Sequence, residues 1–124
     1  MNDIKSFTFL EKLWEIISDR SEKSSPEDSY VAYLLSQGIE KCAKKLGEES
    51  IETIVASLEK EDKTKMIHES ADLLFHLLVL WKAQGINPSL VMDELKSREK
   101  VSGLKEKRNS MLDIETILTN VKLN

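Results

Sequence analysis

The sequence predicts an all-α protein, a helical bundle of four to five helices. Apolar residues recur at helical spacing in several long segments, and no segment shows the apolar–polar alternation that is typical of a half-buried strand. The 124 residues include only four Gly and two Pro, which leaves room for long helices. The length fits one domain with a core that is thin for its most apolar helix, so we expect dimerisation to complete the bundle.

The N-terminal part of the chain predicts an amphipathic helix at about 7–20, where apolar residues recur every three or four positions. Residues 21–29 are polar and indicate a loop. Within this loop, Ser25 and Pro26 precede two acidic residues. This pattern is typical of a helix start, because Pro suits the first turn and acids suit the positive end of the helix dipole. We therefore expect the second helix to begin there.

Two helices are expected in the middle of the chain. A short apolar segment at 30–35 reaches Gly38, which bends or breaks the helix, and the apolar period then resumes from 39 to 58. After a charged turn, residues 66–83 form the most apolar stretch of the chain. We expect this central helix to end at Gly85, as a C-cap glycine, and to be covered by neighbouring helices or by a second subunit.

The C-terminal part of the chain predicts one more helix and an extension. Asn87 and Pro88 suit the N-cap and the first position of a helix. We place the domain at 1–108, and we expect 109–124 to be a C-terminal extension with a weak helical period.

Four carboxylates are spaced so that they can face one another across two helices. Glu49 and Glu52 are three residues apart, and so are Glu69 and Asp72. Residues three or four apart share one helix face, so antiparallel packing would bring both pairs to one point, with Glu48 nearby as a fifth. Two carboxylates about 5 Å apart repel by roughly 3 kcal/mol at an effective dielectric constant of 20, so such a group needs a compensating charge.

A divalent cation is the compensating charge that the sequence favours. Ligands that are all oxygen suit Mg²⁺ or Mn²⁺ rather than Zn²⁺. Mg²⁺ keeps several waters and shares its coordination sphere with substrate phosphates, which indicates phosphate chemistry. The alternative from spacing alone is a solvated acidic face on two surface helices, since Glu is a good helix former.

Several side chains near the acids offer further contacts, each with a plainer alternative. Lys45 could meet a substrate phosphate beside the metal, or it could form an ion pair with Glu49 one turn later. His76 could assist the acids, whereas a core histidine is the more common case, and His68 is expected to face solvent. Arg20 is a candidate phosphate or ribose contact, with a solvated surface charge as its alternative.

Composition excludes several classes of function. The formal net charge of −4 and the lack of a basic patch argue against nucleic-acid binding. No segment approaches the ~18 apolar residues that a membrane span needs, and the N-terminus lacks a signal-peptide pattern, so we expect a cytoplasmic protein. Cys42, Trp14 and Trp81 lie on apolar helix faces and are expected in the core.

Four segments form a set that points to one family: LEKLW at 10–14, PEDSY at 26–30, KLGEE at 45–49 followed by Glu52, and ESADLLFHLLVL at 69–80. Together they resemble phosphoribosyl-ATP pyrophosphohydrolase, the second-step enzyme of histidine biosynthesis. The acidic motif alone is shared with the wider MazG-like and dimeric dUTPase-like pyrophosphohydrolases. The Ser-Tyr segment and the Phe-His-Leu-Leu-Val-Leu run are the features that point to this one family among them. The likeness covers roughly residues 9–108.

The resemblance implies a homodimeric, Mg²⁺-dependent hydrolase that splits phosphoribosyl-ATP between its α and β phosphates into phosphoribosyl-AMP and pyrophosphate. Catalytic roles are implied for Glu48 and Glu49, where Glu48 completes a second metal site or orients the attacking water. The implied metal ligands are Glu49, Glu52, Glu69 and Asp72. The expected contacts with this nucleotide substrate are Lys45, Tyr30 and Arg20.

Departures from the family pattern leave these acids untouched. Val31 replaces a Thr, Ser50 and Ser70 replace small apolar residues, and 110–124 extend beyond the likeness. Two alternative functions stay open. One is a house-cleaning nucleoside-triphosphate pyrophosphohydrolase, which would use the same acids with a different base pocket. The other is a non-catalytic helical dimer that serves as an interaction module.

Overall fold

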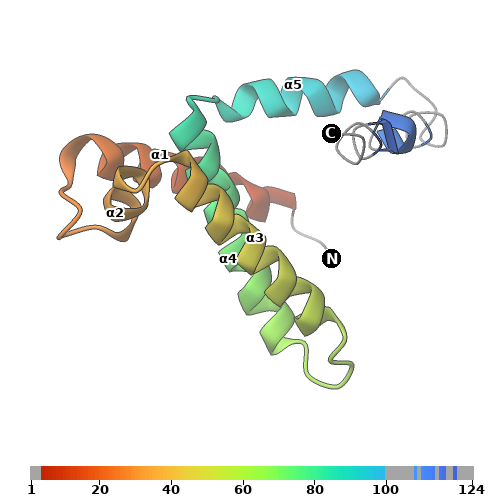
Figure 1. Cartoon of the computed structure of the whole chain (residues 1–124). Helices are drawn as coiled ribbons and strands as arrows, with labels where there is room; N and C mark the ends of the chain where they lie inside the picture. The colour runs from red at the N-terminus through yellow and green to blue at the C-terminus, as the bar shows by residue number, and fades with distance from the viewer. Residues whose placement is uncertain (1–3, 100–107, 109, 114, 117–118, 120–124) are drawn as a thin grey trace. The chain divides into compact units, whose positions relative to one another are not determined.

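The structure is a computed structural model that describes residues 4–99, 108, 110–113, 115–116 and 119. Every regular element in these residues is helical, which confirms the all-α prediction (Figure 1). None of the helices among them combines the length and apolar character that a membrane span requires. The chain divides into two compact units, Met1–Asn87 and Pro88–Asn124. The elements are a 3-10 helix η1 (Ile4–Thr8) and the helices α1 (Phe9–Lys23), α2 (Tyr30–Ser36), α3 (Ile39–Ser57), α4 (Thr64–Gln84) and α5 (Pro88–Arg98).

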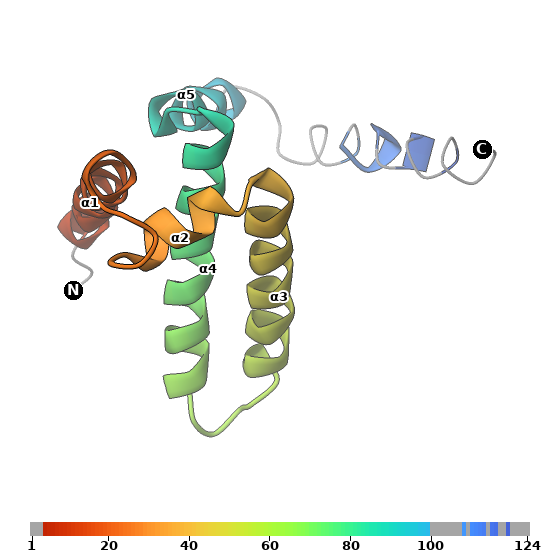
Figure 2. The same cartoon turned by 60° about the vertical axis from the view of Figure 1, so that its left-hand side comes forward.

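Helices α3 and α4 form an antiparallel hairpin that dominates the first unit (Figure 2). Gly38 precedes α3 with φ 91°, and Gly85 caps the end of α4 with φ 72°, as predicted for a C-cap glycine. Both values lie in the left-handed region that glycine tolerates without a steric cost. The backbone N–H of Ile86 donates to the Trp81 carbonyl at 2.9 Å, which closes the end of α4.

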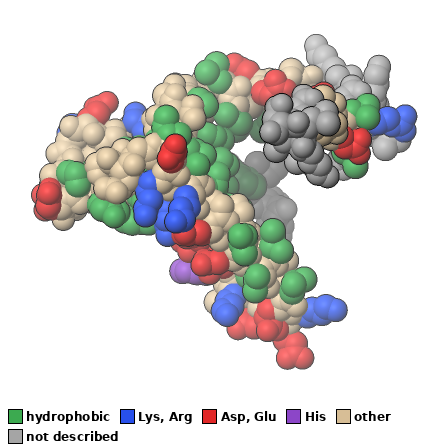
Figure 3. All heavy atoms as spheres, viewed as in Figure 1, with side chains coloured by type: hydrophobic (Ala, Val, Ile, Leu, Met, Phe, Trp, Pro, Cys, Tyr) green, Lys and Arg blue, Asp and Glu red, His purple; other side chains and the backbone are tan. Residues whose placement is uncertain are grey.

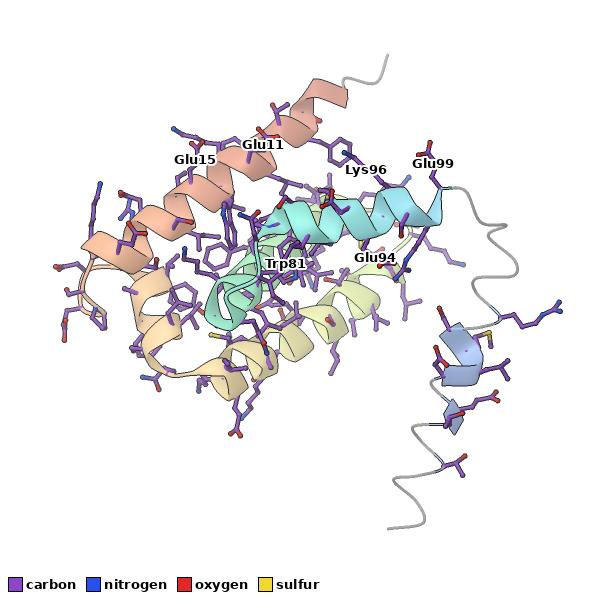
Figure 4. The ribbon with its side chains drawn as sticks, turned by 90° about the horizontal axis from the view of Figure 1, so that it is seen from above. Glu11, Glu15, Trp81, Glu94, Lys96 and Glu99 are labelled. Atoms are coloured by element: carbon purple, nitrogen blue, oxygen red, sulfur yellow. The ribbon has the colours of Figure 1, made fainter. Side chains whose placement is uncertain are left out.

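The core lies where α1 and α2 pack against the C-terminal half of α4. Trp14 and Trp81 pack against this core, and Cys42 is buried in it, so the three core predictions are confirmed. Burial raises the pKa of the Cys42 thiol, whose Sγ donates to the Leu34 carbonyl at 3.3 Å. Glu11 and Glu15 lie on the outer side of α1 (Figure 4). The buried apolar residues of this cluster are Ile17, Val31, Leu34, Cys42, Leu78 and Val79.

The predicted start of the second helix is wrong. Helix α1 extends to Lys23, and α2 begins only at Tyr30, with Ser29 as its N-cap, whose Oγ accepts from the Ala32 N–H at 3.2 Å. The Ser25 carbonyl instead accepts from the N–H groups of Asp28 and Ser29 at 3.0 and 3.1 Å. These bonds close a turn before the helix, so the serine four residues later takes the cap.

The predictions for the C-terminal part are only partly open to comparison. Helix α5 begins at Pro88, as predicted. Of the predicted extension at 109–124, the structure describes only residues 110–113, 115–116 and 119, which are helical. The rest of the extension and residues 100–107 beside the predicted domain boundary lie outside the described residues, so that boundary stays a prediction.

Candidate metal centre

The α3–α4 hairpin brings carboxylates from two helices together. One carboxylate oxygen each from Glu49 and Glu52 on α3 and from Glu69 on α4 lie within 4.8 Å of one another. The three-residue spacing places the first two on one face of α3, and the antiparallel packing sets that face against α4. Thr53 helps to hold the two helices together, because its hydroxyl donates to the Glu49 carbonyl at 2.7 Å and lies 3.3 Å from that of Glu69.

Two of these carboxylates have a buried oxygen that accepts no hydrogen bond from the part of the chain described here: Oε2 of Glu49 and Oε2 of Glu69. Glu49 is only 8% exposed, and its burial, followed by the charges of Glu52, Asp72 and Glu69, raises its pKa. Burial and the neighbouring Glu52 likewise raise the pKa of Glu69. The group therefore has surplus negative charge and acceptor capacity that a bound cation would satisfy.

Asp72 lies at the edge of this group and faces a histidine. Nε2 of His68 is 3.3 Å from Oδ2 of Asp72, and one ligand atom each from His68, Glu69 and Asp72 lie within 4.8 Å of one another. His68 is exposed, as predicted, but its contact with Asp72 was not anticipated. The i,i+4 spacing from 68 to 72 is the signal that could have revealed it.

Glu48 is not one of the three clustered carboxylates and pairs with a lysine. Its Oε2 is 3.2 Å from Nζ of Lys45, and this hydrogen bond is the main cause that raises the pKa of Lys45. The ion pair that the sequence suggested, from Lys45 to Glu49, is therefore wrong. Because Glu49 is buried against α4, the exposed carboxylate of Glu48 is the one that the lysine reaches. Figure 3 shows Lys or Arg side chains beside Asp and Glu side chains on the surface of the hairpin.

His76 is the buried histidine that the sequence favoured, and it also borders the acids. It is 6% exposed, and its Nε2 lies 3.8 Å from Oε1 of Glu49. The Phe75 and Tyr30 rings stand edge-on to it, with centroids 5.0 and 6.1 Å away. Burial, and secondarily the charge of Lys45, lower the pKa of His76, so its ring is neutral at pH 7.

The three expected substrate contacts are thus placed differently. Tyr30 stands against His76, and Lys45 lies one turn before the acids on α3. Arg20 is an exposed residue in the last turn of α1 and forms no ion pair with the acids within residues 4–99. Tyr30 and Lys45 therefore lie at the edge of the carboxylate group, whereas Arg20 does not.

A groove of about 580 Å³ leads from the carboxylates toward the hairpin loop. Glu52 and Glu69 form its inner end, and Lys65 lies in its wall. The remaining walls are mostly apolar, so the carboxylates open onto a surface that suits a partly apolar partner or ligand. The apolar side chains of this groove are Ile51, Val55, Ala56 and Leu58.

Comparison with known proteins gives a consistent picture. Residues 10–99 match the model of the phosphoribosyl-ATP pyrophosphohydrolase family. A relative from Granulibacter bethesdensis is 47% identical over 98 residues, which cover 79% of this chain and 60% of the relative. One from Paramagnetospirillum magneticum is 45% identical over 81% of this chain and 90% of the relative, and one from Allorhizobium ampelinum is 47% identical over 84% and 97%. All three are named phosphoribosyl-ATP pyrophosphatase.

Proposed function

Because the chain belongs to the phosphoribosyl-ATP pyrophosphohydrolase family, we propose that it hydrolyses phosphoribosyl-ATP to phosphoribosyl-AMP and pyrophosphate in a Mg²⁺-dependent reaction. This is the second step of histidine biosynthesis. The observation that carries the proposal is the set of three carboxylates within 4.8 Å, two of them with a buried oxygen that accepts no hydrogen bond from the described chain.

The donor set fits a hard divalent cation. Its oxygens come from carboxylates alone, which suits Mg²⁺ or Mn²⁺, and the burial and neighbouring acids that raise the pKa of Glu49 impose costs that a bound cation would offset. We assign the role of metal ligands to Glu49, Glu52, Glu69 and Asp72. When bound, the cation would supply a water of lowered pKa and would stabilise charge on the leaving pyrophosphate.

The remaining side chains have proposed roles in positioning. Glu48 stands outside the buried group, so its carboxylate is free to orient the attacking water or to accept its proton once a phosphate attracts Lys45. Lys45 then neutralises a phosphate oxygen. The half-exposed ring of Tyr30 offers a stacking surface for the nucleotide. Arg20 is proposed as a substrate contact on its charge alone.

A substrate panel tests this function. We expect Mg²⁺-dependent pyrophosphate release from phosphoribosyl-ATP, at least about 100-fold faster than from dUTP, dCTP or ATP, and its loss when EDTA is added. Preference for an ordinary nucleotide would instead assign the same acids to house-cleaning hydrolysis. No release from any of the four would leave the helical interaction module as the better reading.

We also propose that the chain is a homodimer. Four apolar side chains recur at i, i+3, i+4 and i+7 on α3 and remain 62% to 72% exposed; these residues, the α3 apolar stripe, are Ile51, Ile54, Val55 and Leu58. On α4, Ile67 is 70% exposed. An uncovered stripe of this width is typical of an interface, and a two-fold axis would let two copies cover each other.

Sedimentation velocity tests the dimer. We expect the wild type to have twice the chain mass of 14.2 kDa, and Ile54→Glu to shift the protein to the monomer without loss of helical content, because this side chain is exposed within one chain. Ile39→Glu, at the other end of α3, is the matched control and should stay dimeric. A monomeric wild type would contradict the proposal.

A further inference from the structure

One buried side chain beside the carboxylates has no role in the proposed reaction so far. His76 on α4 faces Glu49 on α3, with 3.8 Å between Nε2 and Oε1. Both side chains are at least nine-tenths shielded from solvent. A buried polar pair of this kind exists at a desolvation cost, so its retention in the contact between two helices needs an explanation.

The two oxygens of Glu49 have different surroundings. Oε1 faces the imidazole, whereas Oε2 is buried and accepts no hydrogen bond from the described residues. A distance of 3.8 Å is too long for a direct hydrogen bond, but a shift of about 1 Å or one bridging water would complete it. A carboxylate held by one oxygen presents the other in a fixed direction.

The imidazole is itself held in place. The Phe75 ring lies edge-on at 80° and the Tyr30 ring edge-on at 89° to it, so two aromatic neighbours restrict rotation about its side-chain bonds. Contacts therefore link the rings of Tyr30 and Phe75 to His76, and His76 to the carboxylate of Glu49.

We propose that His76 is a positioning residue, whose Nε2 holds Oε1 of Glu49 and thereby directs Oε2 toward the cation. This inference rests on the proposed function, because it assigns a direction to one of the proposed ligands. Groups that orient metal ligands in this way typically change metal affinity 10- to 100-fold when removed.

The test uses two polar replacements that differ in where they donate. In His76→Gln the amide nitrogen occupies the place of Nε2, and in His76→Asn it occupies the place of Nδ1, away from Glu49. Affinity for Mn²⁺ alone, without nucleotide, is measured by the loss of the free-ion signal in electron paramagnetic resonance. We expect His76→Gln to bind within about threefold of the wild type, and His76→Asn and His76→Leu to bind about 10- to 100-fold more weakly.

Circular dichroism melts show which variants are folded, and if His76→Leu is not, the Gln and Asn pair decides. Equal Mn²⁺ affinity in the wild type and in folded His76→Asn would overturn the positioning role and leave the proposed function standing. Failure of the wild type to bind Mn²⁺ would overturn the proposed function, and this inference with it. Equal weakening in His76→Gln and His76→Asn would show a packing role only.

Discussion

Glu52→Gln is expected to lower Mg²⁺-dependent pyrophosphate release by about 10²- to 10³-fold, the range seen when one charge-stabilising group is removed from a site. The replacement keeps the shape of the side chain and removes one charge from a group of three carboxylates, each with one oxygen within 4.8 Å of the others. Because Glu52 is exposed, the helical content and the melting temperature should stay near those of the wild type. Steady-state pyrophosphate release over a range of Mg²⁺ concentrations gives the measurement.

Glu40→Gln is the matched control for Glu52→Gln. Glu40 lies in the first turn of the same helix, is exposed and stands outside the carboxylate group. The rate of pyrophosphate release by Glu40→Gln should therefore equal that of the wild type. Equal activity in both variants would remove the metal centre from the proposed mechanism. A rate that recovers at higher Mg²⁺ would show that the main loss is in metal affinity rather than in the chemical step.

The helices that carry the acids could be predicted from the sequence, because their local signals agree. The apolar period is continuous within α3 and within α4. Gly38 stands just before α3 and Gly85 just after α4, where the backbone takes a positive φ. The predicted start of α2 was wrong because the local signals there conflict. Ser25 and Ser29 are both suitable caps, and only hydrogen bonds in the turn between them decide that the second one serves.

Contacts between helices lay beyond the reach of spacing rules. Periodicity puts Glu49 on one face of α3 and His76 on one face of α4, but it does not fix the register of one helix against the other. The pairing of those two side chains depends on that register and on the rotamers that packing allows. The exposure of the α3 apolar stripe could not be predicted either, because periodicity does not show which apolar face the other helices of the chain leave uncovered.

Glu49→Gln is expected to stabilise the metal-free protein at pH 7.5, by about 1 kcal/mol or more, which corresponds to about 4 °C or more in the melting temperature. Glu49 is a buried carboxylate whose charge no cationic side chain among residues 4–99 neutralises, and its pKa is raised by burial and then by neighbouring acids. A neutral amide of the same shape removes that repulsion and desolvation cost. Thermal melts in EDTA give the difference between the two proteins.

The pH dependence of this difference has a definite sign. Because the folded state binds the Glu49 proton more tightly than the unfolded chain does, the charge lowers the stability of the wild type fully above the raised pKa. As the pH falls through the raised pKa toward the ordinary value of 4.5, the wild type is relieved of that cost, and its deficit relative to Glu49→Gln should disappear. The lowered pKa of His76 acts in the opposite direction in the wild type, destabilising the fold as the pH falls below 6.5.

Saturating Mg²⁺ should reverse the order of the two melting temperatures at pH 7.5. A ligand at 100 times its dissociation constant stabilises the folded state by about 2.7 kcal/mol, and the wild type should gain this while Glu49→Gln, with a weakened site, gains little. The same carboxylate would thus lower stability without the ion and raise it with the ion. A buried glutamate with a purely structural role has no reason to change sign, since its contacts do not depend on Mg²⁺. If Glu49→Gln melts below the wild type in EDTA, the carboxylate already has a stabilising partner in the protein, and the electrostatic case for a cation at this position fails.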